Sequence, residues 1–420
     1  MKSRTWRVLA AAVAMLCAAL FAAPPAPAAN DSKDTIKIAY IDPFSGSFAQ
    51  VGDSALKTYN FIVDRVNAQG GALGRKFELV TFDSKLQPAE ALIALKSAID
   101  QNIHFVMQCT GSNVGAALID GVAKHNARNP DNRVLYLNCG ALADELTNEQ
   151  CDFWHFRFDA NTGQRAKVLV QGLPKSIKSV YLINQDYVFG QALQRETRFF
   201  LTQERPDVKI VGDELVPLGK VKDFSSYITK VKASGAQALI TGNWGPDLNL
   251  LMRAGADAGL DIQYYTYLSH LIGGPTAIGP LGEDRLHTVV EFHPNVPGEL
   301  GSAAGQALVE EWRKTHDFDL VGINGYMMFE MLAKAIDKAG STDPLKVALA
   351  LEGMHAQDMM GEDYSMRKDD HQLMEPLYAS VFTKGVKLDS EKTGLGWKTE
   401  TRVKADDLML PTTCKMKRPE

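Results

Sequence analysis

A loop near residue 110 carries the groups best suited to bind a small organic anion. Cys109-Thr-Gly-Ser-Asn-Val114 follows a predicted strand at 104–108 and opens a predicted helix at 114–126. A helix N-terminus has free N–H groups and a partial positive charge, and hydroxyl and amide groups add donors. The loop therefore predicts a carboxylate site. The alternative is that its Ser and Asn side chains only cap the helix, which is their more common role.

Loops after other predicted strands add aromatic, apolar and acidic groups. In a parallel α/β sheet, ligands bind beyond the carboxyl ends of the strands, so these loops should face one cleft. Asp247 opens a predicted helix at 248–258 and could pair with a ligand cation or only interact with the helix dipole. The predicted ligand-binding residues are Phe48, Gln50, Val51, Thr110, Ser112, Asn113, Gly140, Ala141, Leu142, Tyr187, Phe189, Trp244 and Asp247.

Sequence motifs for catalysis, nucleotide binding and metal binding are missing. The chain has no G-x-S-x-G, H-E-x-x-H, G-x-x-x-x-G-K-[ST] or G-x-G-x-x-G. The run Asp369-Asp-His371 suits a turn better than a metal site, because its acids and histidine are adjacent. We expect no catalytic residue, metal or cofactor. An exported α/β enzyme stays the less favoured alternative, since no nucleophile–base pair can be named.

Predicted strands and helices alternate along the chain, which indicates an α/β fold with parallel sheets. The β-α pattern restarts at a short aromatic strand, 153–158, and later segments include a strand at 287–293 and helices at 299–315, 322–339 and 343–352. We expect two doubly wound lobes joined by crossover strands, with a ligand cleft between them. Lobe 1 is predicted at 30–155 and 286–360, lobe 2 at 156–285 and 361–400, and a tail of loops at 401–420.

The first 29 residues have the pattern of a cleavable signal peptide. Basic residues precede an apolar run at 8–21, and Ala26-Pro-Ala28 offers a cleavage site. Four cysteines follow, and in an oxidising compartment they allow three disulfide connectivities. Cys109 and Cys139 each follow a strand of the same sheet, so we predict the pair Cys109–Cys139. Cys151 precedes the crossover, near where a returning tail could lie, so we predict Cys151–Cys414 as the second pair.

The charge composition of the chain bears on which classes of macromolecule it could bind. The 420-residue chain has 45 Lys+Arg against 50 Asp+Glu, for a formal net charge of −5. No basic patch with interleaved aromatic residues occurs, so nucleic acid is not an expected partner.

Several motifs together resemble type I periplasmic binding proteins, of the leucine/isoleucine/valine type that serves ABC transporters. They are Pro43-Phe-Ser-Gly46 with Gly52, Val66-Asn-Ala-Gln-Gly-Gly-Ala-Leu-Gly-Arg75, Asp186-Tyr-Val-Phe-Gly190, Lys222-Asp-Phe224 and Ala335-Ile-Asp-Lys-Ala-Gly-Ser-Thr-Asp-Pro344. The resemblance implies two lobes, joined by three crossovers, that close on a small ligand and dock on a membrane permease.

The resemblance also implies roles for single residues. The carboxylate-binding hydroxyl falls on Thr110 or Ser112, a backbone contact on Gly140, and the acid that binds an α-ammonium on Asp247. Apolar and aromatic walls fall on Val51, Tyr187, Phe189 and Trp244.

Two positions depart from the family pattern. Leu142 stands where branched-chain amino-acid binders have a threonine that helps to hold the ammonium, and residues 83–88 lack the cysteine that pairs with the equivalent of Cys109. An aromatic carboxylate is therefore a second ligand class, and an amide or urea is less favoured.

The predicted function is the periplasmic substrate-binding component of an ABC importer. Its partners are a small carboxylate ligand (a branched-chain or other amino acid, or an aromatic acid) and a membrane permease, and the protein is expected to be a monomer. A periplasmic ligand sensor for a signalling partner would have the same fold and is the alternative.

Overall fold

The first sheet carries the N-terminal part of the fold. The computed structural model describes residues 35–419, so the predicted signal peptide lies outside the described residues. The sheet is parallel, with strand order β2-β1-β3-β4-β5. Its strands are β1 (Ile36–Asp42), β2 (Phe77–Asp83), β3 (Phe105–Gln108), β4 (Leu135–Asn138) and β5 (His155–Arg157), and helices α1 (Ala49–Ala68), α2 (Pro88–Asp100) and α3 (Ser112–Arg128) connect them.

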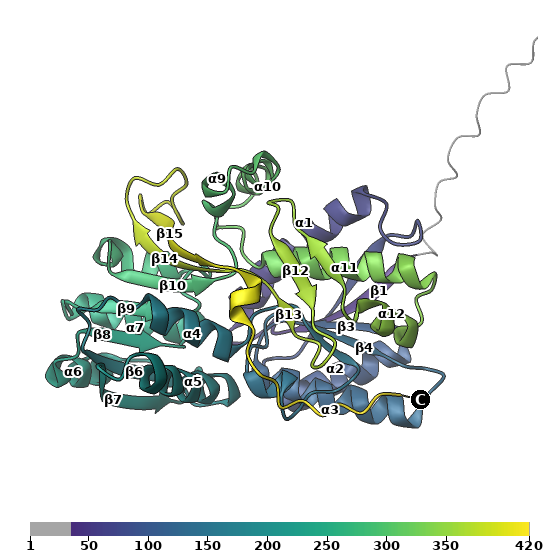
Figure 1. The fold of residues 1–420 in the computed structure, drawn as a ribbon, viewed down its shortest axis with the longest axis horizontal. Coiled ribbons are helices and arrows are strands. Elements are labelled where there is room, and N and C mark those ends of the chain that lie inside the picture. The colour runs from purple at the N-terminus through teal and green to yellow at the C-terminus, as the bar shows by residue number, and fades with distance from the viewer. Residues whose placement is uncertain (1–34, 420) are drawn as a thin grey trace, which may run out of the picture. The chain divides into compact units, whose positions relative to one another are not determined.

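The second sheet has the order β15-β14-β10-β9-β8-β6-β7. Strands β6 (Ser179–Gln185), β7 (Lys209–Val216), β8 (Ala238–Thr241), β9 (Gln263–Thr266) and β10 (Leu286–Val290) are parallel, whereas β14 (Leu377–Thr383) and β15 (Gly396–Val403) are antiparallel. Its helices are α4 (Thr162–Gly172), α5 (Val188–Glu204), α6 (Ser225–Ser234), α7 (Gly245–Asp257) and α8 (Gly274–Ile278). Figure 1 shows the two sheets side by side, each with its own helices, which confirms the predicted two-lobed α/β fold.

Shorter elements join and cover the sheets. Helices α11 (Ile323–Ala339) and α12 (Pro344–Leu351) return to the first sheet, where α11 packs on α1 and α12 contacts β4. A three-stranded antiparallel sheet lies beside them. The other elements are α9 (Val296–Glu299), α10 (Ala303–Arg313), β11 (His355–Gln357), β12 (Asp363–Met366), β13 (Leu373–Met374) and the 3-10 helices η1 (Asp144–Thr147), η2 (Gly279–Gly282) and η3 (Ala405–Leu408).

Local side-chain chemistry sets several helix starts. Asn161 caps α4, since its side chain accepts the Gln164 N–H and Gln164 returns a bond to the Asn161 N–H. The single helix predicted at 299–315 is wrong, because Gly301 has a positive φ of 70° and Ser302 then caps a new helix, α10.

The chain passes between the two lobes three times. The first crossover follows β5, the second follows β10, and the third lies between β13 and β14. Two segments differ from the predicted lobe assignments. Strand β10, predicted to begin lobe 1, pairs with β9 and β14 of the second sheet. Gln372, predicted in lobe 2, forms a bridge with Arg157 of β5. The division into lobes stays a prediction, with β10 moved to lobe 2 and the segment around Gln372 moved to lobe 1.

The C-terminal region contains a strand where loops were predicted from residue 385 on. Strand β15 pairs with β14 at the edge of the second sheet, and only its first two residues are buried. Its remaining residues, largely exposed and polar, lack the apolar alternation that marks a strand in a sequence.

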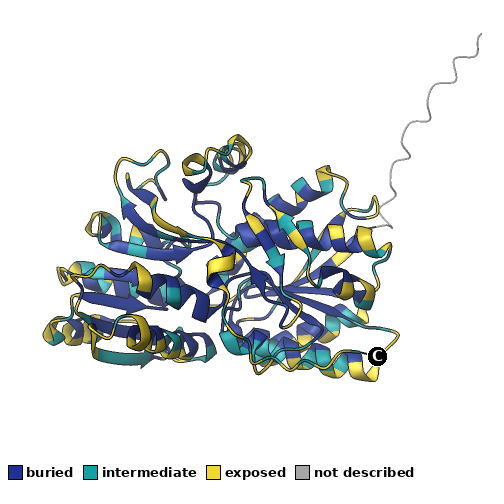
Figure 2. Ribbon diagram, in the orientation of Figure 1, coloured by how far each residue is buried: buried dark blue, intermediate teal, exposed yellow. Residues whose placement is uncertain are grey.

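Burial is concentrated in the strands. Figure 2 shows the interior strands of both sheets mostly buried, whereas the outer faces of the helices are exposed. Within residues 35–419, no helix is both long enough and apolar enough to cross a membrane.

The structure contains the two disulfides that the sequence suggested. Gln108 at the end of β3 lies opposite Asn138 at the end of β4, so the next residues, Cys109 and Cys139, are neighbours with Cα atoms 4.5 Å apart. Cys151 is bonded to Cys414 with Cα atoms 5.7 Å apart, which fastens the C-terminal segment to lobe 1.

Candidate functional site

A cavity of about 110 Å³ lies between the two lobes. Lobe 1 contributes residues from α1, from the loops after β3 and β4, and from the start of α11. Lobe 2 contributes residues from the loops after β6, β8 and β9 and from the crossovers. Of the predicted ligand-binding residues, the lining includes Val51, Thr110, Ser112, Gly140, Leu142, Tyr187, Phe189 and Trp244.

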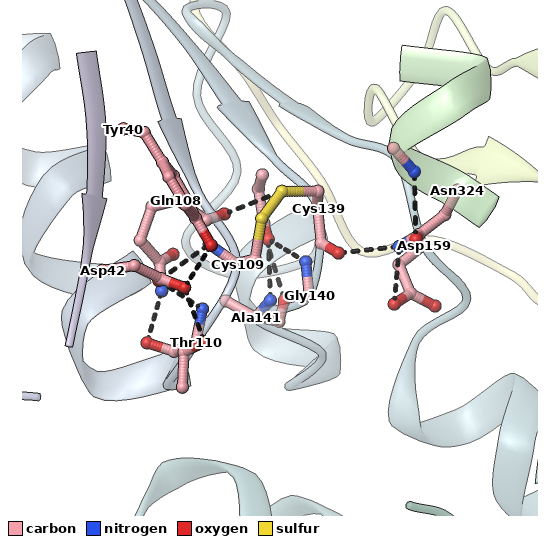
Figure 3. The surroundings of a disulfide bond; sticks show 12 residues. Tyr40, Asp42, Gln108, Cys109, Thr110, Cys139, Gly140, Ala141, Asp159 and Asn324 are labelled. Carbon is pink, nitrogen blue, oxygen red and sulfur yellow. Dashed lines mark hydrogen bonds between the residues drawn. A yellow bond between two sulfur atoms is a disulfide. The ribbon is translucent and has the colours of Figure 1, made fainter. Parts of the chain in front are cut away.

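The donors of the predicted carboxylate loop are partly occupied by a carboxylate of the protein itself. Asp42, at the end of β1, accepts the Thr110 hydroxyl at 2.8 Å and the N–H groups of Cys109 and Thr110 at 3.2 and 2.8 Å. Tyr40 donates to the same carboxylate at 2.7 Å. Burial raises the pKa of Asp42, although these hydrogen bonds act to lower it. Figure 3 shows this network beside the Cys109–Cys139 disulfide.

Ser112 is the hydroxyl of this loop that stays available to a ligand. It is buried, lines the cavity and stands at the first position of α3. Its oxygen accepts the Ala143 N–H at 3.1 Å, which leaves the hydroxyl proton to be donated. A ligand carboxylate at this place would meet Ser112 and the free N–H groups of the first helical turn.

Aromatic side chains close one side of the cavity. Trp244 donates its indole N–H to the Tyr187 hydroxyl at 2.8 Å, and the rings of Tyr187 and Phe189 lie 6.0 Å apart. Phe48 comes from lobe 1 and packs on Trp244 of lobe 2, with ring centroids 4.6 Å apart. Phe48 is therefore a contact between the lobes behind Trp244 and is not part of the cavity lining.

Asp247 does not line the cavity. Its carboxylate accepts the Gln185 amide and the Gly219 N–H, both at 2.8 Å, and so holds the loop after β7 against the start of α7. Burial raises the pKa of Asp247, while the same hydrogen bonds act to lower it.

Three other predicted residues also lie outside the lining. Gln50 is exposed on α1. Asn113 donates to the Leu86 carbonyl at 3.4 Å, and the Ala141 N–H donates to Asn138 at 2.8 Å. The polar groups of Asn113 and Ala141 are therefore bonded to neighbouring protein groups and not directed at the cavity lining.

Sequence reasoning missed a group of buried charges at the base of the cavity, which we call the hinge cluster: Asp159, Arg165, Glu291 and Glu375. Each carboxyl comes from a different crossover, and Arg165 stands in the first turn of α4. The Arg165 guanidinium contacts Asp159 at 2.5 Å and Glu291 at 2.9 Å. Asp159 and Arg165 line the cavity together with Glu291.

Burial and charge set the ionisation of this cluster. Burial acts to lower the pKa of Arg165, but Asp159 and Glu291 raise it above its usual value. Burial raises the pKa of Asp159 to about 7, against the effect of Arg165. For Glu291, Arg165 and His270 outweigh burial and the pKa is lowered. Burial, with repulsion from Asp159 and Glu291, raises the pKa of Glu375 well above its usual range.

The sequence holds one weak signal for this cluster. Glu291 follows the apolar run of β10 and precedes Phe292, so a charge lies where a buried strand ends. Buried charges are rare unless they are paired. The three crossovers are far apart in sequence, and nothing local indicates that they meet.

His270, another residue of the lining, predicts a pH effect on stability. Burial lowers its pKa from 6.5 to about 4. Because the unfolded chain binds this proton more readily, stability is lost as the pH falls from 6.5 toward 4. Between pH 6.5 and pH 4, the free energy of unfolding of the wild type is expected to fall by about 3 kcal/mol more than that of His270→Gln. Urea unfolding of both proteins at a series of pH values measures the difference, and parallel curves would contradict it.

Comparison with known proteins identifies the family to which this fold belongs. A family model described as "Periplasmic binding protein" matches residues 35–386. The chain belongs to the periplasmic binding protein family. Periplasmic binding proteins are solute-binding proteins and not enzymes, and they work with the permeases of ABC transporters. A periplasmic location follows from the family, and disulfides fit an oxidising compartment.

Individual periplasmic binding proteins resemble the chain over most of its length. The Leu/Ile/Val-binding protein homolog 4 of Brucella abortus (strain 2308) is 32% identical over 414 residues, which cover 96% of this chain and 97% of that protein. The closed conformation of a leucine-, isoleucine-, valine-, threonine- and alanine-binding protein from Brucella ovis has a TM-score of 0.81 and 29% identity, over 92% of this chain and 100% of that one.

A more distant structure shares the fold. A solute-binding protein from Rhodopseudomonas palustris BisB5, in complex with 3,4-dihydroxybenzoic acid, has a TM-score of 0.75 at 18% identity, over 89% of this chain and 98% of that one.

Proposed function

We propose that this protein is the substrate-binding component of an ABC importer for aliphatic amino acids. The observation that carries the proposal is the lining of the cavity, which is apolar on one side and polar at both the start of α3 and the crossovers. Such a cavity suits a small zwitterion with an apolar side chain. One polar end of the cavity can bind the ligand's carboxylate, and the other can bind its ammonium group. The relatives at 32% and 29% identity are amino-acid binders by name.

The ligand's carboxylate is assigned to Ser112 and the first turn of α3. Thr110, the other hydroxyl of this loop, already donates to Asp42. The apolar side chain of the ligand is assigned to the wall of Val51, Leu142, Phe189 and Trp244. Leu142 enlarges the apolar wall where a threonine would have offered a polar group.

Delivery and location complete the proposal. The protein acts as a monomer that presents its closed lobes to a membrane permease, after export by residues 1–29. Transport is separated from sensing by uptake of a radiolabelled amino acid in cells with and without the gene. Unchanged uptake together with a lost transcriptional response to the ligand would favour a sensor.

A thermal-unfolding screen tests the ligand class. Leucine, isoleucine, valine and alanine are compared with benzoate and 3,4-dihydroxybenzoate. A ligand present at a hundred times its Kd is expected to add about 2.7 kcal/mol to the free energy of unfolding. An increase with the aliphatic amino acids supports the proposal. An increase with the aromatic acids alone would replace it with an aromatic-acid importer, and no increase with any compound would refute the site.

A further inference from the structure

We propose that the hinge cluster is the subsite for a cationic group of the ligand, with Glu291 and Asp159 as the residues that hold it. The inference rests on the proposed function and deepens it, because it names the group that selects an amino acid over a simple carboxylate. It also moves this role from Asp247, the acid that the sequence favoured, to the crossovers between the lobes.

The base of the cavity has more carboxyl groups than cations. One guanidinium faces the carboxylates of both Asp159 and Glu291. The donors of Arg165 are already engaged, since its Nη1 donates to the Val289 carbonyl at 2.8 Å and its Nε to the Ala160 carbonyl at 3.4 Å. Arg165 therefore positions the two carboxylates and has little capacity left for a ligand anion. Two carboxyl groups, with only one guanidinium between them, therefore face the cavity.

Polar side chains beside the cluster face the cavity, and one of them has no partner within the described residues. His270 and Tyr59 both line the cavity and are 5% and 4% exposed. The Nδ1 atom of His270 is buried and has no hydrogen-bond partner within residues 35–419, and Tyr59 places a second polar side chain in the same part of the lining. Such groups are costly to bury unpaired. An ammonium group, with three donors, can supply partners to a neutral histidine, a tyrosine oxygen and a carboxylate.

The carboxyl groups of the hinge cluster belong to segments that connect the two lobes. Asp159 also accepts the Asn324 amide at 3.0 Å, and the same amide donates to the Cys139 carbonyl at 2.7 Å (Figure 3). The cluster is thus held to lobe 1 by Asn324, whereas Glu291 extends from β10 of lobe 2. Glu375, on the third crossover, has no hydrogen-bond partner for either oxygen within the described chain. A cation at this place can bond to Asp159 and Glu291 together, which come from two different crossovers, and so favours their close approach.

Asp247 lacks these features. Both of its close donors belong to the protein, and its side chain is outside the lining. It provides a matched acidic control that is also buried and also lies beside the cleft.

Calorimetry with two probes tests the inference. Leucine carries an ammonium group, and 4-methylpentanoate has the same carbon skeleton and carboxylate without it. The wild type is expected to bind leucine and to bind 4-methylpentanoate at least about 10-fold more weakly, because a charge-assisted hydrogen bond contributes about 1.5–3 kcal/mol. Glu291→Gln and Asp159→Asn are each expected to weaken leucine binding by about 10- to 150-fold. Asp247→Asn is expected to change it less than about 3-fold.

Each result supports or overturns the inference. If Glu291→Gln and Asp159→Asn bind leucine within 3-fold of the wild type, or if 4-methylpentanoate binds the wild type as tightly as leucine, the subsite is not here. A large loss in Asp247→Asn alone would return the role to Asp247. Failure of the wild type to bind any amino acid overturns the proposed function and this inference with it. Circular dichroism verifies folding, and if one carboxyl variant fails to fold, the other variant together with the two probes decides.

Discussion

Replacing Arg165 by methionine is expected to lower the free energy of unfolding by about 3–5 kcal/mol, the range found when one partner of a buried ion pair is removed. Arg165 is 1% exposed and is the cation between Asp159 and Glu291. Methionine has a similar length but leaves two carboxylates facing each other, with Glu375 close by. Chemical denaturation at neutral pH measures the loss.

Arg195 offers a matched control for this prediction. It also contacts three carboxylates, those of Asp144, Glu145 and Glu196, but its side chain is 48% exposed. Arg195→Met is expected to cost no more than about 1 kcal/mol, because solvent screens exposed ion pairs. Adding Glu291→Gln to Arg165→Met should recover part of the loss by removing one uncompensated charge. Equal effects of the two arginine substitutions would contradict the assigned role of Arg165.

Removing the Cys151–Cys414 disulfide is the second change with a large expected effect. The bond closes a loop of 263 residues, so it restricts the unfolded chain strongly. Cys151→Ser together with Cys414→Ser is expected to lower the free energy of unfolding by about 2–5 kcal/mol. Urea unfolding of the oxidised wild type and the double variant gives the difference.

The second disulfide serves as the comparison. Cys109–Cys139 closes a loop of only 30 residues, and the chain-entropy effect grows with loop length, so the loss on replacing this pair by serines should be smaller by about 2 kcal/mol. If the Cys151/Cys414 variant unfolds at the same denaturant concentration as the wild type, the C-terminal segment frays without affecting the lobes, and the prediction fails.

Local patterns were enough to predict the parallel sheets. Apolar strands alternate with amphipathic helices over 35–290, which predicts parallel sheets, whereas the strand order β2-β1-β3-β4-β5 came from the structure. The pairing of Cys109 with Cys139 could also be foreseen, because each cysteine follows a strand of the same sheet. What local patterns missed was β15, whose edge position leaves most of its residues exposed.

Residues of the cavity lining could be predicted where backbone position alone decides which segment faces the cleft. Val51, Ser112, Tyr187 and Trp244 all line the cavity, as loops at the carboxyl ends of parallel strands should. Side-chain direction was beyond the sequence. Thr110 and Asp247 lie on the right loops, yet Thr110 donates to Asp42, and Asp247 accepts from Gln185 and Gly219.

The sequence by itself determined the fold class, the family and the loops that surround the cleft, because these depend on short-range periodicity and on motifs within single segments. Only the tertiary structure decided which charges meet at the hinge. Asp159, Glu291 and Glu375 are separated by more than 80 residues from one another. They come together because three crossovers pass between the lobes at one place, and the pairing of buried charges depends on distances that no local pattern encodes.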